Sequence, residues 1–232
     1  MIAVRKAARR GQTRFDWLDS RHSFSFGHYF DPENVQFGAL RVINDDWIAG
    51  GGGFPPHSHR DMEIVTYMVT GTLAHEDSTG GRETIGPGEV QRMTAGTGIT
   101  HSEFNASDTE PVRLLQIWLL PAEKGLKPGY EQTRFSPADK AGKLLAIASG
   151  RGKKGALRIH QDADIYASVL AAGDRLSHAL APGRRAWVQV VTGGLALNGL
   201  DLAEGDGAAI TSETALDFAA AEGAEFLLFE LA

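Results

Sequence analysis

Two short segments of the sequence carry paired side chains that commonly bind metals. His57 and His59 are two residues apart in PPHSHRDME, and His101 and Glu103 have the same spacing in TAGTGITHSEFN. Residues i and i+2 of a β-strand face the same side and lie about 6 to 7 Å apart, so each pair can direct both of its groups at one cation. If the two segments form neighbouring strands inside a barrel, three imidazole nitrogens and one carboxylate oxygen converge. The pattern predicts a mononuclear metal site made of these four residues.

A metal in this protein must be bound through nitrogen and oxygen, because the sequence has no cysteine. That absence also excludes disulfides, iron–sulfur clusters and a cysteine nucleophile. Three imidazoles and a carboxylate suit divalent first-row ions, so iron(II), manganese, nickel, copper and zinc are all compatible with the predicted site. A purely structural zinc is disfavoured, since structural zinc sites mostly use cysteine. Four ligands leave one or two coordination positions for an exchangeable molecule, which a catalytic metal requires.

The elements that must position these residues are short β-strands. The 28 glycines fall between short runs of β-branched and aromatic residues, which is typical of many strands joined by tight turns. Helix-length amphipathic periodicity is hard to find. Strands are expected over residues 37–43, 63–69, 88–93, 113–119, 186–191 and 225–231. The sequence therefore predicts an all-β fold.

A weak internal repeat divides the chain. VTGTLA at residues 69–74 is followed by VTGGLA at 191–196, an offset of 122 positions, and residues 88–94 and 205–211 share a similar pattern at nearly the same offset. Two β-barrels in tandem explain both echoes, and the alternative is chance recurrence of residues common in hairpins. The expected domains are 1–130, with the metal, and 131–232, joined through a stretch rich in Pro, Gly, Lys and Glu from Pro121 to about Ser149.

Longer motifs resemble a known family. The run of Gly51, five residues, His57, one residue, His59, three residues and Glu63 is similar to the first cupin motif, and residues 88–105 resemble the second. From end to end the chain resembles the pirin family, and its bacterial pirin-like quercetin 2,3-dioxygenases above all. The matching stretches are WLDSRHSFSFGHYFDP, FGALRVINDD, HSHRDMEIVTY, AHEDSTG, MTAGTGITHSEFN, QIWLLP, IHQDADIY and RRAWVQVVTG.

The resemblance implies a bicupin, that is, two tandem jelly-roll-like cupin barrels, with one metal ion in the first barrel. It implies iron(II) as the first expectation for the ion, and a dioxygenase that opens the heterocyclic ring of flavonols such as quercetin with dioxygen. It also implies which carboxylate binds the metal. Strand parity alone lets either Glu63 or Glu103 face inward, whereas the pirin pattern uses Glu103, which is then also a candidate general base. Two departures from the general cupin pattern, Thr94 in place of a proline and a late Gly71, touch no expected ligand.

The second half of the chain is expected to lack metal ligands. The 122-residue offset places Ala179 and Ala181 opposite the first histidine pair. His178 and His160 are isolated histidines, and we interpret both as packing or surface residues.

The remaining histidines have structural interpretations as well. His22 and His28 stand among aromatic residues and are expected to pack, and His75 is expected to make a structural hydrogen bond rather than bind metal. The residues that bind substrate cannot be identified from the sequence. Candidates for an apolar wall are Phe37, Trp47 and Phe54.

Charge limits the partners. The formal net charge is −6, with 29 acidic and 23 basic residues, so direct binding to nucleic acid or to an anionic membrane is not expected. No apolar run approaches the roughly 18 residues of a membrane span, and we expect a cytoplasmic protein. Two functional alternatives stay open beside flavonol dioxygenation: a dioxygenase for another small molecule, and a metal-dependent or redox-sensing regulator that acts through a protein partner.

Overall fold

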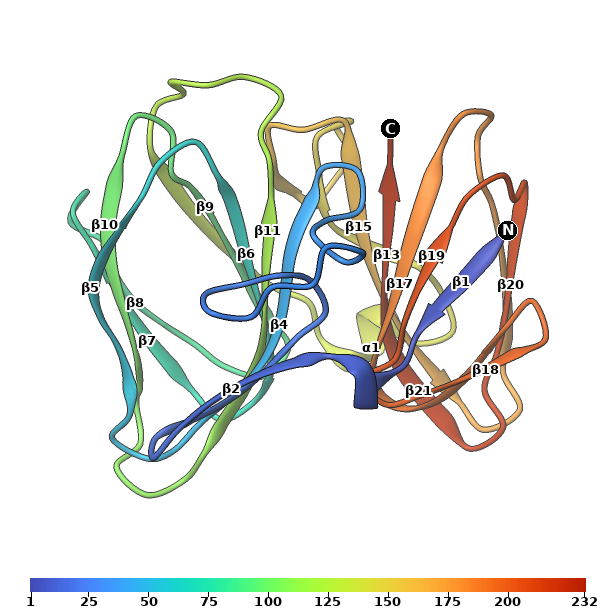
Figure 1. The fold of residues 1–232 in the computed structure, drawn as a ribbon, viewed down its shortest axis with the longest axis horizontal. Helices are drawn as coiled ribbons and strands as arrows, with labels where there is room; N and C mark the ends of the chain where they lie inside the picture. Colours follow the sequence, from blue (N-terminus) through green and yellow to red (C-terminus); the bar gives the residue numbers. More distant parts are fainter. The chain divides into compact units, whose positions relative to one another are not determined.

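The computed structural model describes all 232 residues, and nearly all of its regular structure is antiparallel β-sheet (Figure 1). The predicted all-β fold is therefore confirmed. The chain divides into two compact units: an N-terminal unit of residues 11–134 and 157–161, and a C-terminal unit of residues 1–10, 135–156 and 162–232. The expected domains 1–130 and 131–232 remain a proposal, to which the contacts add that residues 1–10 group with the C-terminal half.

The N-terminal unit contains two antiparallel sheets. One has seven strands in the order β12-β9-β6-β11-β4-β3-β2, and the other has four in the order β5-β10-β7-β8. Their bounds are β2 Gly11–Phe15, β3 Leu18–His22, β4 Leu40–Ile48, β5 Gly53–His59, β6 Glu63–Thr70, β7 Leu73–Asp77, β8 Arg82–Ile85, β9 Glu89–Thr94, β10 Ile99–Asn105, β11 Val112–Leu119 and β12 Gly129–Arg134. The unit also contains the two-residue strand β14, Leu157–Arg158, which belongs to neither of these sheets.

The alternation of side chains along the strands determines which residues of this unit face its hydrophobic core. In β10 every second residue from Ile99 is buried, as expected for a strand with one face toward the interior. β6 is rich in β-branched and aromatic residues and is buried on both faces over most of its length. An apolar cluster joins residues of both sheets: Leu18, Ile48, Met68, Leu73, Ile85, Val112 and Leu114, with Trp17 and Phe54 packed against it.

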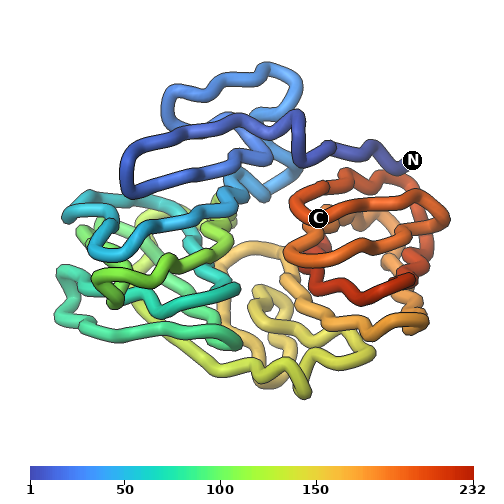
Figure 2. The backbone as a smooth tube through the Cα atoms, turned by 90° about the horizontal axis from the view of Figure 1, so that it is seen from below, coloured from blue at the N-terminus to red at the C-terminus, as the bar shows by residue number.

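The C-terminal unit is built around the order β1-β19-β17-β21-β15-β13, and β16, β18 and β20 pair beside it. Figure 2 shows the N-terminal strand β1 beside the late strands, in keeping with its antiparallel pairing to β19. A capping box in which Ser136 and Asp139 exchange hydrogen bonds begins the single turn of helix α1. The bounds are β1 Ile2–Arg5, the 3₁₀ turn Ala7–Arg9, α1 Pro137–Lys140, β13 Leu145–Ser149, β15 Ala163–Ala171, β16 Arg175–Ala179, β17 Arg185–Leu197, β18 Leu200–Ala203, β19 Gly207–Ile210, β20 Ala215–Ala219 and β21 Gly223–Leu231.

The sequence echo has a structural counterpart at two glycines. Gly71 and Gly193 have nearly the same backbone angle, φ of 74° and 76°, in the left-handed region that favours glycine. A Cβ at Gly71 would lie 2.8 Å from the carbonyl oxygen of Pro111, and one at Gly193 would lie 2.1 Å from that of Gly223. Both positions lie where a core strand turns into the next pairing, from β6 to β7 and along β17 from β21 to β18. The repeat therefore marks the same bend in each unit.

Each expected strand overlaps an observed one, and most ends agree to within two residues. The strand expected at 186–191 instead continues to Leu197 as part of β17, and the one expected at 37–43 is shifted. The strand expected at 37–43 begins only at Leu40 and continues to Ile48, because Phe37 and Leu40 form a tight turn closed by reciprocal backbone hydrogen bonds. Along β4, Asn44 and Asp46 therefore share one face and Asp45 and Trp47 share the other.

Candidate metal centre

The four residues predicted to bind metal lie on two adjacent strands. β5 and β10 pair antiparallel, with His57 opposite His101 and His59 opposite Ile99, and the register shifts between His101 and Glu103. Such a local irregularity re-aims side chains, which is common beside functional sites. The arrangement brings the three histidines together and places Glu103 on the same face of β10 as His101.

The three imidazoles face one point. Ring centroids are 4.5 Å apart for His57 and His101, 4.8 Å for His57 and His59, and 4.9 Å for His59 and His101. One ligand nitrogen from each ring lies within 4.8 Å of the others. A separation of this size can be bridged by one ion with small side-chain adjustments.

The protonation of these rings suits metal binding. Burial, followed by repulsion from neighbouring imidazoles, lowers the pKa of His59 to about 4 and that of His101 to about 3, so both rings are neutral at pH 7. His57 Nδ1 lies 2.8 Å from the carbonyl oxygen of Pro55, to which it can donate, and this leaves Nε2 as the free lone pair. His101 is 2% exposed, and neither of its ring nitrogens has a hydrogen-bond partner. Buried polar atoms nearly always have a hydrogen-bond partner or another ligand, so the unpaired His101 nitrogens indicate a site where a metal ion could bind.

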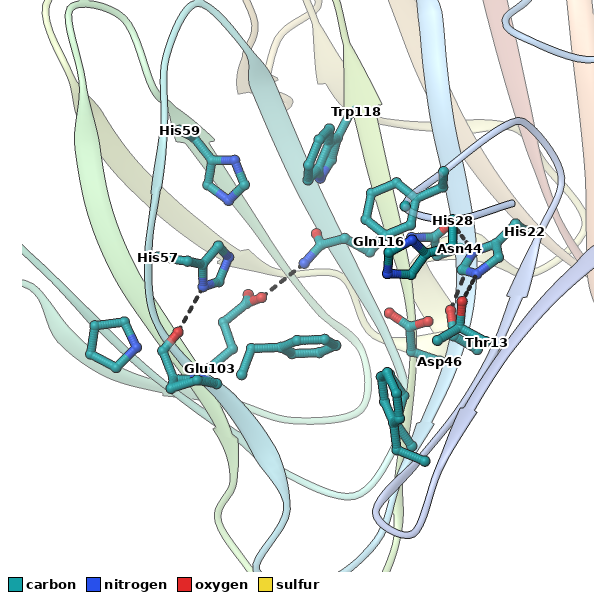
Figure 3. A pocket seen from close by; sticks show the side chains of 18 residues that line it. Thr13, His22, His28, Asn44, Asp46, His57, His59, Glu103, Gln116 and Trp118 are labelled. Atoms are coloured by element: carbon teal, nitrogen blue, oxygen red, sulfur yellow. Dashed lines mark hydrogen bonds between the residues drawn. The ribbon is translucent and has the colours of Figure 1, made fainter. Parts of the chain in front are cut away.

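Glu103 is fixed by two glutamine amides. Gln91 donates to Oε1 and Gln116 to Oε2, each over 2.9 Å, and Figure 3 shows the second of these bonds. Thr66 joins the two amides, since its hydroxyl donates to Gln116 Oε1 and accepts from Gln91 Nε2. Burial, with a smaller contribution from the Asp46 charge, raises the pKa of Glu103 to about 7. The amides thus orient a carboxylate that can bind a cation or exchange a proton near neutral pH.

These supporting residues were missed by sequence reasoning. Thr66, Gln91 and Gln116 each stand inside a strand that is otherwise largely apolar, and all three are buried. A buried polar residue in an apolar strand is the signal that could have identified them, because it needs a partner on the interior face.

The alternative carboxylate, Glu63, has other partners. It is fully buried, accepts a hydrogen bond from Thr94 Oγ1 at 3.1 Å and lies 3.4 Å from His160 Nδ1. Thr94 therefore has a structural reason to replace the proline of the general cupin pattern. Glu63 is not among the residues that gather around the histidine cluster.

His75 makes the expected structural hydrogen bond and also lies close to the candidate metal centre. Its Nε2 is 3.1 Å from Asp77 Oδ2, and its ring lies 5.2 Å from that of His101 and 4.8 Å from that of Tyr130. One potential ligand atom each of His75, His101 and Glu103 lie within 4.8 Å of one another. This proximity could not be predicted from the sequence, because it depends on the pairing of β7 with β10.

A cavity of about 400 Å³ opens beside the histidines within the N-terminal unit. Of the expected apolar wall, Phe54 lines the cavity and Phe37 and Trp47 do not; the Trp47 ring instead covers the guanidinium of Arg113 at 4.6 Å on the opposite face of β4. His22 and His28, interpreted as packing residues, also line it. The lining residues are Thr13, Phe15, Leu18, Ser20, His22, Phe26, Gly27, His28, Asn44, Asp46, Phe54, Pro55, Pro56, His57, His59, Glu103, Gln116 and Trp118.

No helix of the structure has the length and apolar character needed to cross a lipid bilayer.

Comparisons with known proteins match the whole chain. A family model described as Pirin matches residues 3–119, and one described as the quercetinase C-terminal cupin domain matches residues 146–231. Quercetin 2,3-dioxygenase of Escherichia coli (strain K12) is 47% identical over 231 residues, which cover 100% of this chain and 99% of that protein. A putative quercetin 2,3-dioxygenase of Pseudomonas aeruginosa is 44% identical over 233 residues, covering 100% of both.

Solved structures show the same similarity. The crystal structure of YhhW from Escherichia coli superposes with a TM-score of 0.96 at 46% identity, and covers 100% of this chain and 98% of that one. The bacterial pirin YhhW in complex with nickel(II) gives a TM-score of 0.95 at 45% identity, with 100% and 99% covered.

Proposed function

This chain belongs to the pirin family, and from that premise we propose that it is a quercetin 2,3-dioxygenase-type enzyme, which opens the heterocyclic ring of flavonols with dioxygen. Full-length identity to quercetin 2,3-dioxygenases supports the reaction. The observation that carries the proposal is the cluster of three histidines beside a cavity of about 400 Å³ with aromatic walls. That volume lies within the range of about 300–1,000 Å³ typical of small-molecule sites.

We further propose that His57, His59, His101 and Glu103 hold one divalent transition metal ion. The unpaired nitrogens of His101 and the two amide bonds that orient Glu103 support this assignment. The nickel(II) in the YhhW complex shows that a similar protein accepts a first-row ion. We propose iron(II) as the native ion, with copper, nickel, manganese and zinc also compatible with the donor set. When bound, the ion supplies Lewis acidity for the 3-oxygen of the flavonol and a redox centre for dioxygen.

The protein's own groups then account for binding and proton transfer. The flavonol loses the proton of its 3-hydroxyl, and Glu103 is placed to accept it, because its carboxyl lines the cavity in which the flavonol would bind. The amides of Gln91 and Gln116 keep the carboxylate in one orientation during that transfer. Phe26, Phe54 and Trp118 present apolar surface to the flat rings and exclude water from them.

The test is turnover by the purified protein loaded separately with iron(II), copper(II), nickel(II) and manganese(II). Quercetin absorbance and the dissolved oxygen concentration should fall together with at least one ion, and His59→Ala should abolish both changes. An Asp19→Asn variant, altered on β3 outside the cavity lining, should keep full activity. No turnover with any ion, alongside binding of one ion per chain, would reject the enzyme and favour the regulatory alternative. That alternative, like a cytoplasmic location and a different small-molecule substrate, stays a prediction.

A further inference from the structure

A buried carboxyl faces the cavity on the side away from His57 and His59. Asp46 lies on β4, is 3% exposed and lines the cavity. Figure 3 shows its carboxyl pointing into the space that also holds Glu103 and Gln116. The strand pairing explains the position: on β4, Asn44 lies opposite Gln116 and Asp46 opposite Leu114, one step further along the same face.

The Asp46 carboxyl has hydrogen-bonding capacity that the protein does not use. Ser20 supplies one side-chain hydrogen bond, whereas Oδ1 is buried and has no partner. The neighbouring polar groups are engaged with each other, since His22 Nδ1 lies 2.7 Å from Asn44 Oδ1 and His22 Nε2 lies 2.8 Å from Thr13 Oγ1. A buried acceptor without a donor is unfavourable, so a ligand that brings a hydroxyl to this position gains affinity.

The charges around Asp46 define the kind of group it can accept. No lysine or arginine lines the cavity. The nearby cation, Arg113, is held by Asp45 at 2.9 Å on the other face of β4. The nearby Asp45 and Glu103 are also acidic, and burial raises the pKa of Asp46 to about 7. An anionic substituent would be repelled here, whereas a neutral hydroxyl can donate to the carboxyl.

We propose that Asp46 is a specificity-determining residue that accepts a hydrogen bond from a hydroxyl on the 2-aryl ring of the flavonol. The 2-aryl ring is attached next to the carbon that bears the 3-oxygen, so anchoring that oxygen at the metal ligands directs the ring across the cavity. Asp46 thus selects flavonols with hydroxylated 2-aryl rings over those without. The inference rests on the proposed function, because it assumes that the 3-oxygen binds at His57, His59, His101 and Glu103.

Three flavonols that differ only in this ring provide the test: quercetin with two hydroxyls on it, kaempferol with one, and galangin with none. Their dissociation constants are measured without oxygen on nickel(II)-loaded protein, by the change in flavonol absorbance, for the wild type, Asp46→Leu and Asp46→Asn. Asp19→Asn is the control, since it removes a carboxylate from the adjacent strand outside the cavity lining. Thermal unfolding of each variant shows whether it is folded.

We expect the wild type and the control to bind quercetin about tenfold more tightly than galangin, the effect of one hydrogen bond to a carboxylate. Asp46→Leu should weaken quercetin binding about tenfold and leave the dissociation constant of galangin within about twofold of the wild-type value, so that the preference for quercetin disappears. Asp46→Asn, which is nearly isosteric and keeps an acceptor oxygen, should retain part of the preference; it decides the question if the leucine variant does not fold.

Two results would overturn the inference while leaving the proposed function intact: an unchanged preference in a folded Asp46 variant, or an equal loss of affinity for all three flavonols. The first would mean that Asp46 does not contact the ring, and the second that its role is structural. If the wild type binds none of the three flavonols, the proposed function and the inference both fail.

Discussion

Removing one of the two amides that hold Glu103 should weaken metal binding without removing a ligand. In Gln116→Leu, Glu103 Oε2 loses its hydrogen-bond donor at 2.9 Å, while Glu103 Oε1 keeps the bond from Gln91. The Thr66 hydroxyl loses its acceptor on Gln116 but still accepts a hydrogen bond from Gln91. Groups that orient metal ligands are worth about 10- to 100-fold in metal affinity. Since one of the two bonds to Glu103 is lost, we expect the metal affinity of Gln116→Leu to decrease about 30-fold. In a double variant with Gln91→Leu, the total loss of metal affinity should be smaller than the product of the two single losses.

The assay is calorimetric titration of the metal-free protein with nickel(II) at pH 7. Gln189→Leu is the matched control, because Gln189 is also buried but donates to backbone carbonyls in the C-terminal unit. It should lower stability and leave the nickel dissociation constant within about twofold of the wild type. A Gln116→Leu protein that is folded and binds nickel as tightly as the wild type would refute the idea that the amides prepare Glu103 for the metal.

Two further predictions concern stability. Hydrogen bonds from His178 and Arg151 lower the pKa of Glu230 to about 2, so its stabilising contribution is complete above about pH 4.5 and is lost as the pH falls toward 2. Urea unfolding should therefore show Glu230→Gln destabilised by about 1–2 kcal/mol at pH 6, with a difference that shrinks toward pH 3; a constant difference would contradict the assignment. Gly193→Ala should cost at least about 2 kcal/mol, because its Cβ meets the Gly223 carbonyl, whereas Gly199→Ala, with a similar φ but open space, should cost about 1 kcal/mol. Equal costs would show that the close approach is unimportant.

The features that could be predicted from sequence are those set by local spacing. Alternation in a strand places His57 with His59 and His101 with Glu103, and the structure brings the two pairs together on neighbouring strands. The internal repeat could be recognised in the sequence because Gly71 and Gly193 both adopt a positive φ, which favours glycine at both positions.

The features that could not be predicted depend on which strands become neighbours. Gln116 reaches Glu103 only because β11 and β10 face each other across the unit, and nothing in either segment encodes that meeting. Trp47 was expected in the cavity wall, but the start of β4 at Leu40 and its pairing with β3 and β11 turn Asp46 inward and Trp47 outward. The grouping of residues 1–10 with the C-terminal unit is likewise a pairing between distant segments.

The most direct test of the metal centre is the metal content of reloaded and desalted protein, measured by elemental analysis for the wild type, Glu103→Gln and Glu63→Gln. We predict close to one equivalent of ion per chain in the wild type and in Glu63→Gln, because Glu63 is held by Thr94 and lies near His160, away from the histidine cluster. The metal content of Glu103→Gln should fall well below one equivalent per chain. A wild type that never approaches one equivalent, or a loss of metal in Glu63→Gln with full retention in Glu103→Gln, would contradict the proposed centre.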